Sequence, residues 1–257
     1  MENIHPTAIV STNSQIDPSV TVGPFSIIEE NVSIGAGTEI SSHVRIEKFT
    51  RIGTECKIFN GAVVGAIPQD LKFKGEQSVL EIGDRTIIRE LVTISRGTAE
   101  SGKTVIGSNC LLMNYVHVAH DCKIGNHIIL SNSVTLAGHI EIQDHAAIGG
   151  LVPVHQFVRI GKHAFIGGGY RVAQDVPPYI LAAGEPLKFG GLNYVGLKRN
   201  NFSDDQIKTL EKVYYIIYQS HLKRSDAITK IKNEMESSLE AKTVVDFFEN
   251  SERGVIK

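Results

Sequence analysis

Aliphatic residues recur at every sixth position of this chain from Ile4 to Val172. Of the 29 positions in this register, 26 hold Ile, Val or Leu, and only Asp70, Glu76 and Glu100 interrupt it. A period of six fits neither an amphipathic helix, whose period is about 3.6, nor a single half-buried strand. Repeats of six residues over such a length are typical of a parallel β-helix. The pattern therefore predicts a mainly β fold built by stacking short strands.

A second inward-facing position lies two residues before each aliphatic residue, because side chains alternate along a strand. Small or β-branched residues occupy it, and the three cysteines, Cys56, Cys110 and Cys122, all fall there. We expect these thiols to be buried as small apolar groups, with no disulfide and no metal-binding role. Glycine often follows the aliphatic residue, which we attribute to a sharp corner that needs unusual backbone angles.

The chain resembles hexapeptide-repeat proteins, in which three hexads form one coil of a left-handed, three-faced prism. We therefore expect a left-handed parallel β-helix over residues 1–180, carrying the catalytic groups, and a linker with a small C-terminal α-helical domain over 181–257. Interruptions at about 66–79 and 97–103 preserve the phase of the repeat. Loops that leave a rigid repeat and rejoin it in register are candidate functional elements.

The period becomes helical after the repeat. Ser203 and Gln206 form a capping-box pattern, and apolar residues at helical spacing follow it. We expect a second helix to begin near Ser225. A third helix should cover about 241–250, with its two phenylalanines facing inward.

Composition narrows the functional classes. The 257 residues carry a net charge of −2, which argues against a nucleic-acid-binding protein. No apolar run is long enough to cross a bilayer, so we expect no stable membrane insertion. The repeat begins at Ile4, directly after Met1, Glu2 and Asn3, so we expect no signal peptide and a cytoplasmic location.

Seven of the ten histidines lie in the second half of the repeat. His120, Gly138 and Gln156 are spaced by 18 residues, so they should stack on one edge of the prism in successive coils, about 4.8 Å apart. His139 and His155 lie one position from Gly138 and Gln156 and should converge on the same edge. Three histidines and a glutamine there would form an acid/base site.

A second set of histidines, His127, His145 and His163, has the same spacing and should stack at another corner. We favour solvated surface residues or contacts within an oligomer as the interpretation of this column. A metal site would need further ligands, and no carboxylate or cysteine is evident nearby. Its role stays open.

Longer motifs point to one family. They are HVAHDC (117–122), LAGH (136–139), VHQF (154–157), VAQDVPPY (172–179), GLKR (196–199) and RGVI (253–256), and the insertion at 68–72 also matches. In this order the motifs closely resemble the UDP-N-acetylglucosamine O-acyltransferases, whose reaction opens lipid A biosynthesis. The resemblance covers nearly the whole chain, loops and tail included.

The resemblance implies a cytoplasmic homotrimer of a Gram-negative-type bacterium, with sites between subunits. It implies transfer of an (R)-3-hydroxyacyl group from acyl carrier protein to the 3-hydroxyl of UDP-N-acetylglucosamine (UDP-GlcNAc). The acyl thioester on the carrier is the co-substrate, and no cofactor or metal is needed. His120 would be the general base, Asp121 would orient it, and the Gly138 N–H would stabilise the oxyanion. Because a thioester is already activated, direct attack by an alcohol needs no covalent enzyme intermediate.

Further site residues are assigned by the resemblance alone. The expected substrate-binding residues are Asp70, Lys72, His117, His139, His155, Gln156, Asn193 and Arg199. Asp70 and Lys72 lie in the first insertion, whereas Asn193 and Arg199 would lie near the uridine and the phosphates, where an arginine suits a diphosphate. Gly168 matches the position that sets acyl-chain length and would leave an open groove. Tyr170, which occupies a small inward-facing position nearby, would either cap the last coil or shorten the groove, so the chain length stays open.

Other functions fit less well. The later N-acyltransferase of the same pathway has a separate N-terminal uridine-binding domain, and the repeat here leaves no room for one. A γ-type carbonic anhydrase uses two zinc histidines five positions apart, and no pair of histidines here has that separation. A non-catalytic β-helix scaffold would not need the His120 cluster. The sequence leaves open whether the sugar carries a 3-hydroxyl or a 3-amino group, and which residues contact the carrier protein.

Overall fold

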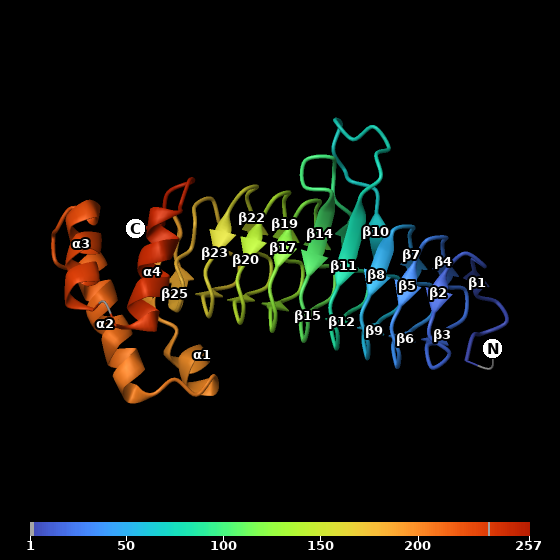
Figure 1. Cartoon of the computed structure of the whole chain (residues 1–257), viewed down its shortest axis with the longest axis horizontal. Coiled ribbons are helices and arrows are strands. Elements are labelled where there is room, and N and C mark those ends of the chain that lie inside the picture. The colour runs from blue at the N-terminus through green and yellow to red at the C-terminus, as the bar shows by residue number, and fades with distance from the viewer. Residues whose placement is uncertain (1–2, 236) are drawn as a thin grey trace.

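The computed structural model of this chain describes residues 3–235 and 237–257. Met1 and Glu2, on which part of the signal-peptide expectation rests, lie outside the described residues, as does Glu236. The molecule is a long prism of stacked coils with helices at its C-terminal end (Figure 1). Each regular coil contributes one short strand to each of three sheets. The expected parallel β-helix followed by a helical region is confirmed.

The three sheets form the faces of the prism, and their strands pair in parallel up to β25. The first sheet contains β1 (Ile9–Val10), β4 (Ile27–Ile28), β7 (Arg45–Ile46), β10 (Val63–Ala66), β13 (Thr93–Ser95), β16 (His117–Val118), β19 (Thr135–Leu136) and β22 (Pro153–Val154). The second sheet contains β2 (Gln15–Ile16), β5 (Ser33–Ile34), β8 (Thr50–Ile52), β11 (Val79–Ile82), β14 (Lys103–Ile106), β17 (Lys123–Ile124), β20 (Glu141–Ile142) and β23 (Arg159–Ile160). The third sheet contains β3 (Thr21–Val22), β6 (Glu39–Ile40), β9 (Lys57–Ile58), β12 (Ile87–Ile88), β15 (Leu111–Leu112), β18 (Ile129–Leu130), β21 (Ala147–Ile148), β24 (Phe165–Ile166), β25 (Ile180–Ala183) and β26 (Lys188–Leu192).

The third sheet runs past the last hexad. β25 pairs in parallel with β24, and β26 then turns back and pairs antiparallel with β25. The predicted domain boundary at residue 180 therefore coincides with the first residue of β25. The division into two domains stays a prediction.

Four helices follow the sheets. They are α1 (Tyr194–Arg199), α2 (Asp204–Tyr218), α3 (Arg224–Glu234) and α4 (Leu239–Glu249). The capping box before α2 is confirmed, because the Ser203 hydroxyl accepts from the Gln206 N–H while the Gln206 side chain accepts from the Ser203 N–H. Phe247 and Phe248 of α4 are buried, as expected. Among the described residues, no helix combines the length and apolarity needed to cross a membrane.

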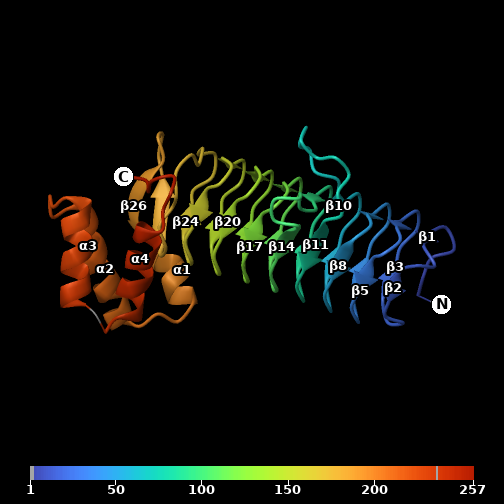
Figure 2. The ribbon, with the colours of Figure 1, turned by 45° about the horizontal axis from the view of Figure 1, so that its top comes forward.

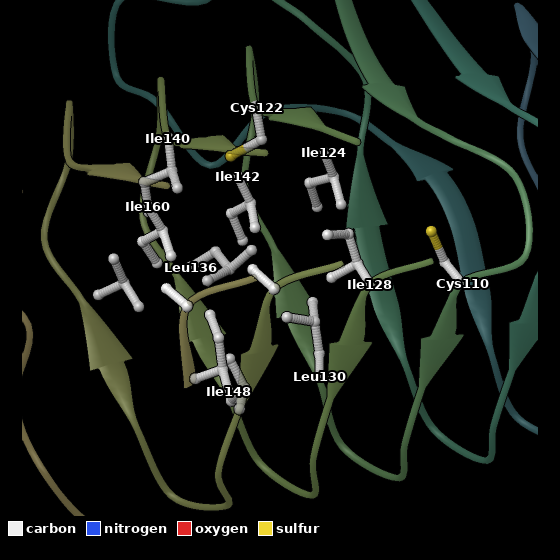
Figure 3. Close-up of a cluster of buried hydrophobic side chains, with 14 of the residues drawn as sticks. Cys110, Cys122, Ile124, Ile128, Leu130, Leu136, Ile140, Ile142, Ile148 and Ile160 are labelled. Carbon is white, nitrogen blue, oxygen red and sulfur yellow. The ribbon is translucent and has the colours of Figure 1, made fainter. Parts of the chain in front are cut away.

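The core of the prism is the predicted pair of inward positions. The aliphatic residue of each hexad and the small residue two before it are almost all buried, and the aliphatic side chains interdigitate between the three sheets (Figure 3). Cys56, Cys110 and Cys122 are free and buried, as expected. Burial raises the pKa of Cys122 to about 12, so this thiol stays protonated and unreactive at neutral pH.

The explanation offered for the glycines after the aliphatic residues holds at Gly65, which has a φ of 87°, and is wrong for most of the others. Gly23, Gly35 and Gly107 do not have positive φ, but a Cβ on each would lie 2.5–2.8 Å from backbone atoms of the next coil. These glycines therefore allow close approach between coils. The left-handed conformation occurs instead three residues after the aliphatic residue, mostly in non-glycine residues such as Asp121 and His139.

Two insertions interrupt the stacking between the first and second sheets. Ile82 pairs with Ile52, which is 30 residues earlier, and Ile106 pairs with Ile82, which is 24 residues earlier; the regular spacing of 18 is seen between Ile124 and Ile142. The extra residues form loops over 67–78 and 97–102, which project from the same side of the prism (Figure 1, Figure 2). We call them the first and second insertion loops.

Candidate active site

The predicted column of site residues lies at the corner where the first sheet ends. Val118, Leu136 and Val154 are paired across β16, β19 and β22. The residues two positions further on, His120 and Gly138, consequently lie in neighbouring coils. A Cβ built on Gly138 would be 2.7 Å from His120 Cε1 and 3.0 Å from its Nε2. The expected proximity of the imidazole and the glycine is confirmed.

His120 and Asp121 form a hydrogen-bonded pair. Nδ1 of His120 lies 2.7 Å from Oδ2 of Asp121. An ionised carboxylate only accepts hydrogen bonds, so we assign the proton to Nδ1. The other ring nitrogen, Nε2, then carries a free lone pair on the side of Gly138. This is the protonation state that a general base needs.

The Asp121 carboxylate is held ionised by a dense set of donors. It accepts hydrogen bonds from the Thr98 N–H (2.9 Å), the Thr98 hydroxyl (2.7 Å) and the Ser101 hydroxyl, in addition to His120. Burial works to raise the pKa of Asp121, but the hydrogen bonds from Ser101, Thr98 and His120 outweigh it and lower the pKa to about 2. The backbone N–H of Asp121 in turn donates to the Thr104 hydroxyl oxygen (2.8 Å).

The backbone N–H of Gly138 has no acceptor among the described residues, although the flanking N–H groups of Ala137 and His139 are both hydrogen-bonded. At the corner after the second sheet, the N–H at the same hexad position binds a side-chain oxygen in several coils. Asn126 N–H donates to Asp144 Oδ1 at 2.7 Å, and the N–H of Ser108 donates likewise to Asn126. The Gly138 N–H is therefore a donor without a partner in the described structure, and it lies beside His120.

His139 lies next to the pair. Its ring meets that of His120 edge-on with centroids 5.1 Å apart, and it stacks on Phe157 at 4.6 Å. Its Nε2 is 3.7 Å from Asp121 Oδ2 and 3.5 Å from Glu100 Oε2. A cavity beside these groups is lined by Glu100, Asp121, His139 and Phe157, among others, but not by His120.

Three further predicted residues lie on or near the same face. His117 is on β16, where its Nδ1 is 2.7 Å from the Thr93 hydroxyl, and burial lowers the pKa of its imidazole. His155 is half-buried with Nδ1 3.2 Å from the carbonyl oxygen of Gln156, whose side chain is exposed. The structure thus brings His120, Asp121, Gly138 and His139 into contact, and leaves His117, His155 and Gln156 at the rim.

The first insertion loop carries Asp70 and Lys72. Asp70 Oδ1 accepts from the Lys72 N–H at 2.9 Å, so the aspartate shapes its own loop, and the Lys72 side chain is exposed. The two insertion loops are joined, because Glu76 Oε1 accepts from the Ala99 N–H at 3.1 Å. The first loop is consequently linked to the loop that holds Asp121.

The remaining predicted residues lie elsewhere on the chain. Asn193 and Arg199 line a largely apolar cavity over the outer face of the third sheet. The Asn193 side-chain oxygen caps α1 by accepting from the Gly196 N–H, and its amide nitrogen donates to the His163 carbonyl. Both polar groups of the side chain therefore hold the local structure. Gly168 is exposed at the corner between the third and first sheets, next to Gly150. One chain therefore carries the predicted site in two separate parts.

Tyr170, which we expected either to end the last coil or to shorten the groove, is half-buried and packs against the core. Its ring lies 3.0 Å from where a Cβ of Gly167 would be. The tyrosine therefore folds back toward the chain instead of lying over Gly168.

The second histidine column is stacked as predicted. Ring centroids are 4.5 Å apart for His127 and His145 and 4.7 Å for His145 and His163, with nearly parallel planes. The column continues onto Tyr179. It becomes more buried along its length, and burial with His145 and Lys162 nearby lowers the pKa of His163 to about 4. His163 is therefore a neutral imidazole packed in the interior, and not a solvated surface residue.

Sequence reasoning missed two residues that the site depends on, Thr98 and Ser101, which hydrogen-bond to Asp121. Both belong to the second insertion loop, whose length changes the spacing from 18 to 24 and hides the loop from a search at fixed intervals. The interruption of the repeat at 97–103, which we singled out as a candidate functional loop, marked this segment but not which of its side chains reach Asp121.

A metal ion is conceivable at one place in the described part of the chain. The donor atoms of His120, Asp121 and His139 lie within 4.8 Å of one another. A carboxylate offers about four lone-pair sites. The hydrogen bonds to Thr98, Ser101 and His120 already use that number on Asp121, so the set favours a hydrogen-bonded pair over a metal centre.

Known proteins match this chain over its full length. Residues 103–138 match the bacterial transferase hexapeptide family, and residues 175–256 match domain 2 of the UDP N-acetylglucosamine O-acyltransferases. Acyl-[acyl-carrier-protein]--UDP-N-acetylglucosamine O-acyltransferase of Chlorobaculum parvum is 58% identical over 99% of this chain and 97% of its own. The relative of the same description from Thermodesulfovibrio yellowstonii is 48% identical, with all of both chains covered.

Solved structures agree with the sequence matches. LpxA of Bacteroides fragilis, described as a UDP-N-acetylglucosamine acyltransferase, superposes with a TM-score of 0.97 at 49% identity, covering 98% of this chain and 99% of the other. LpxA of Acinetobacter baumannii gives 0.96 at 43% identity, covering 99% and 100%. Sequence and structure together place this chain in the family of acyl-[acyl-carrier-protein]--UDP-N-acetylglucosamine O-acyltransferases.

Proposed function

We propose that this chain transfers an (R)-3-hydroxyacyl group from acyl carrier protein to the 3-hydroxyl of UDP-GlcNAc. Membership in the family supports the acyl-carrier-protein-dependent O-acyltransferase activity that opens lipid A biosynthesis. The observation that carries the chemistry is the His120–Asp121 pair beside the unbonded Gly138 N–H. A base and an oxyanion donor around one carbonyl are what attack of an alcohol on a thioester requires.

In the proposed reaction the sugar oxygen attacks the thioester carbon while His120 Nε2 takes the hydroxyl proton. The Asp121 carboxylate stabilises the imidazolium that forms through the bond to Nδ1–H. The Gly138 N–H donates to the oxygen of the tetrahedral intermediate. When the intermediate collapses, the carrier thiolate leaves and takes the proton back from His120, so no acyl-enzyme and no cofactor are needed.

Substrate binding is proposed to use residues from both parts of the chain. His117, His139, His155 and Gln156 surround the reacting groups, and Asp70 and Lys72 approach from the first insertion loop. Asn193 and Arg199 would bind the nucleotide and Gly168 would border the acyl groove. Because these last three lie away from His120 in one chain, we propose that the enzyme is a cytoplasmic homotrimer whose sites form between subunits. The apolar cavity over the third sheet, which includes Leu111, Ile129 and Phe165, supports such a contact.

An acyl-transfer assay with UDP-GlcNAc and a set of 3-hydroxyacyl carrier proteins tests the proposal. Mass spectrometry of the product identifies the chain length that the Gly168 groove accepts. In parallel, the 3-amino analogue of the sugar tests the acceptor atom. Preference for the amine, or absence of product with every acyl chain, would contradict the proposed reaction.

His120→Ala is the matching variant. We expect turnover to fall at least about 100-fold, the usual contribution of a general base, with the fold and the oligomer unchanged. His5→Ala, which removes an imidazole at the N-terminal end of the prism, is the control and should keep wild-type activity. If His120→Ala retained more than about a tenth of wild-type activity, the assignment of the base would be wrong.

A further inference from the structure

The second insertion loop closes over the Asp121 carboxylate and supplies nearly all of its hydrogen bonds. The Thr98 N–H and the Ser101 hydroxyl donate to Oδ1, and the Thr98 hydroxyl donates to Oδ2. The fourth donor is His120 Nδ1, also to Oδ2. The Asp121 side chain is 1% exposed, so water does not compete for these positions.

We propose that Thr98 and Ser101 are positioning residues, which fix the Asp121 carboxylate so that His120 keeps its proton on Nδ1 and its lone pair on Nε2. The proposal rests on the proposed function, because it gives the loop a role in the same proton transfer. It names a task for the second insertion loop that neither the repeat nor the core requires.

The number of donors is what fixes the carboxylate. With about four lone-pair sites and two donors on each oxygen, a partial rotation of the carboxylate about its Cβ–Cγ bond weakens hydrogen bonds on both oxygens in a buried site. Oδ2 is consequently held at 2.7 Å from His120 Nδ1. If one loop donor is lost, the carboxylate can turn toward His139 Nε2, which is 3.7 Å from Oδ2. The imidazole of His120 would then be free to carry its proton on Nε2, where it cannot act as a base.

The loop itself is anchored independently of the carboxylate. Its Gly102 N–H donates to the Thr98 carbonyl at 2.8 Å, and Glu76 accepts from Ala99. A Cβ on Gly97 would lie 2.3 Å from the Lys103 backbone nitrogen, so the two ends of the loop meet closely. The two side chains also make contacts inside the loop, because Thr98 Oγ1 accepts from the Glu100 N–H and Ser101 Oγ lies 2.9 Å from the Lys103 carbonyl oxygen. We expect the backbone contacts and the Glu76 bond to keep the loop in place when these side chains are changed.

Thr98→Val and Ser101→Ala, singly and together, test the proposal, with Thr98→Ser as the conservative variant that keeps the hydroxyl. Thr86→Val is the matched control, since the buried Thr86 hydroxyl donates to the Gly107 carbonyl and not to a carboxylate. The measurements are kcat and KM for UDP-GlcNAc, thermal unfolding, and NMR of selectively ¹⁵N-labelled histidine, with the His120 signals assigned by their loss in His120→Asn.

We expect Thr98→Val to lower kcat about 10-fold, the effect of removing one donor to a charged group, with KM changed by less than about twofold. The His120 signals should shift from the Nδ1–H form toward a mixture of both forms. The double variant should lose less than the product of the single effects, because both hydroxyls act on one carboxylate. Thr98→Ser should restore activity, and Thr86→Val should lower stability without changing kcat or the His120 signals.

An unchanged Nδ1–H form in Thr98→Val and Ser101→Ala would overturn the proposal, as would a kcat loss that Thr86→Val reproduces. Ser101 is exposed, so Ser101→Ala keeps the test valid even if Thr98→Val does not fold. The two proposals fail separately. Wild-type protein that is inactive with UDP-GlcNAc contradicts the proposed function, whereas the NMR readout still reports on the hydrogen bonding of His120.

Discussion

Corner residues include the proposed catalytic groups and make most of the ring stacking of the prism. Among the described residues, twenty non-glycine residues have positive φ, and seventeen of them lie three positions after the aliphatic residue of a hexad. Asp121, His139 and Phe157 form one column of this kind, and His127 and His145 begin another. A left-handed conformation costs about 1–2 kcal/mol for such residues, so the contacts between successive coils must offset it.

Gly138 is required because the His120 ring occupies the space where a side chain at position 138 would lie. It does not have positive φ, so alanine is compatible with its backbone, but the added Cβ would collide with the His120 ring. We predict that Gly138→Ala lowers kcat at least about 100-fold, although the backbone N–H is retained, because the imidazole is displaced from its base position. Steady-state kinetics with a thermal unfolding control measures this. Activity near wild type would show that the ring can move without loss.

His163 should make the fold sensitive to acid. Its pKa is lowered from 6.5 to about 4 by burial and by His145 and Lys162, with Asp144 acting in the opposite direction. The unfolded chain therefore binds more protons between these pH values. Its contribution to stability is complete above pH 6.5 and decreases as the pH falls toward 4, by at most about 3 kcal/mol.

His163→Phe keeps the ring column and removes the titrating group, whose Nδ1 is buried without a hydrogen-bond partner in the described structure. We predict that the variant loses this acid dependence and is the more stable protein at pH 4.5. Urea unfolding from pH 4.5 to 8 at one protein concentration provides the measurement. His127→Phe, at the exposed end of the same column, is the control. Equal slopes for wild type and His163→Phe would contradict the prediction.

At the scale of elements, the strands could be predicted and parts of the tail could not. The hexad register fixes which side chains face inward, so strand positions, cysteine burial and the His120–Gly138 contact follow from counting. α1 was missed because its six residues, Tyr194–Arg199, are too few for a helical period. The role of the glycines was misjudged because contact between coils is not visible in one linear sequence. The Thr98 and Ser101 contacts depend on how a loop folds back, which no periodicity encodes.

The hydrogen bond between Glu76 and Ala99, which joins the two insertion loops, gives a prediction at the scale of elements. Glu76 accepts hydrogen bonds from the Lys74 and Ala99 N–H groups. Its own backbone N–H, followed by those of Lys74 and Ala99, lowers the pKa of its carboxylate. We predict that Glu76→Gln speeds hydrogen exchange at Ala99 and Lys74 several-fold while exchange in the sheets is unchanged, because only the contact between loops is weakened. Glu30→Gln, at an exposed salt bridge with Lys48, should change neither. Unaltered exchange at Ala99 would show that the loops are held by other contacts.

For the whole molecule, the separation of the predicted site into two parts is the main finding. His120 lies at the end of the first sheet, whereas Asn193 and Arg199 lie over the third. Sequence counting placed the first part correctly but could not place the second, because α1 and the C-terminal tail have no repeat to locate them. The two parts can meet in one site only if a second copy supplies the other half.

Mixing of inactive variants tests this arrangement. His120→Ala and Arg199→Ala should each be nearly inactive, but trimers reassembled from equal amounts should recover about a quarter of wild-type activity, because one site in four then receives both intact residues from different chains. Light scattering establishes the oligomeric state of each sample. If the mixture stays inactive while mixed trimers form, the two residues do not serve one shared site.

The position of the proposed site along the prism determines which coils can be added or lost without disturbing it. The groups that touch Asp121 come from its own coil and the insertion loop before it, and Gly138 comes from the coil after it. Coils nearer the N-terminus contribute none of them. Evolution can therefore lengthen or shorten that end of the prism by whole turns and alter the reach of the molecule while the proposed catalytic centre is inherited intact.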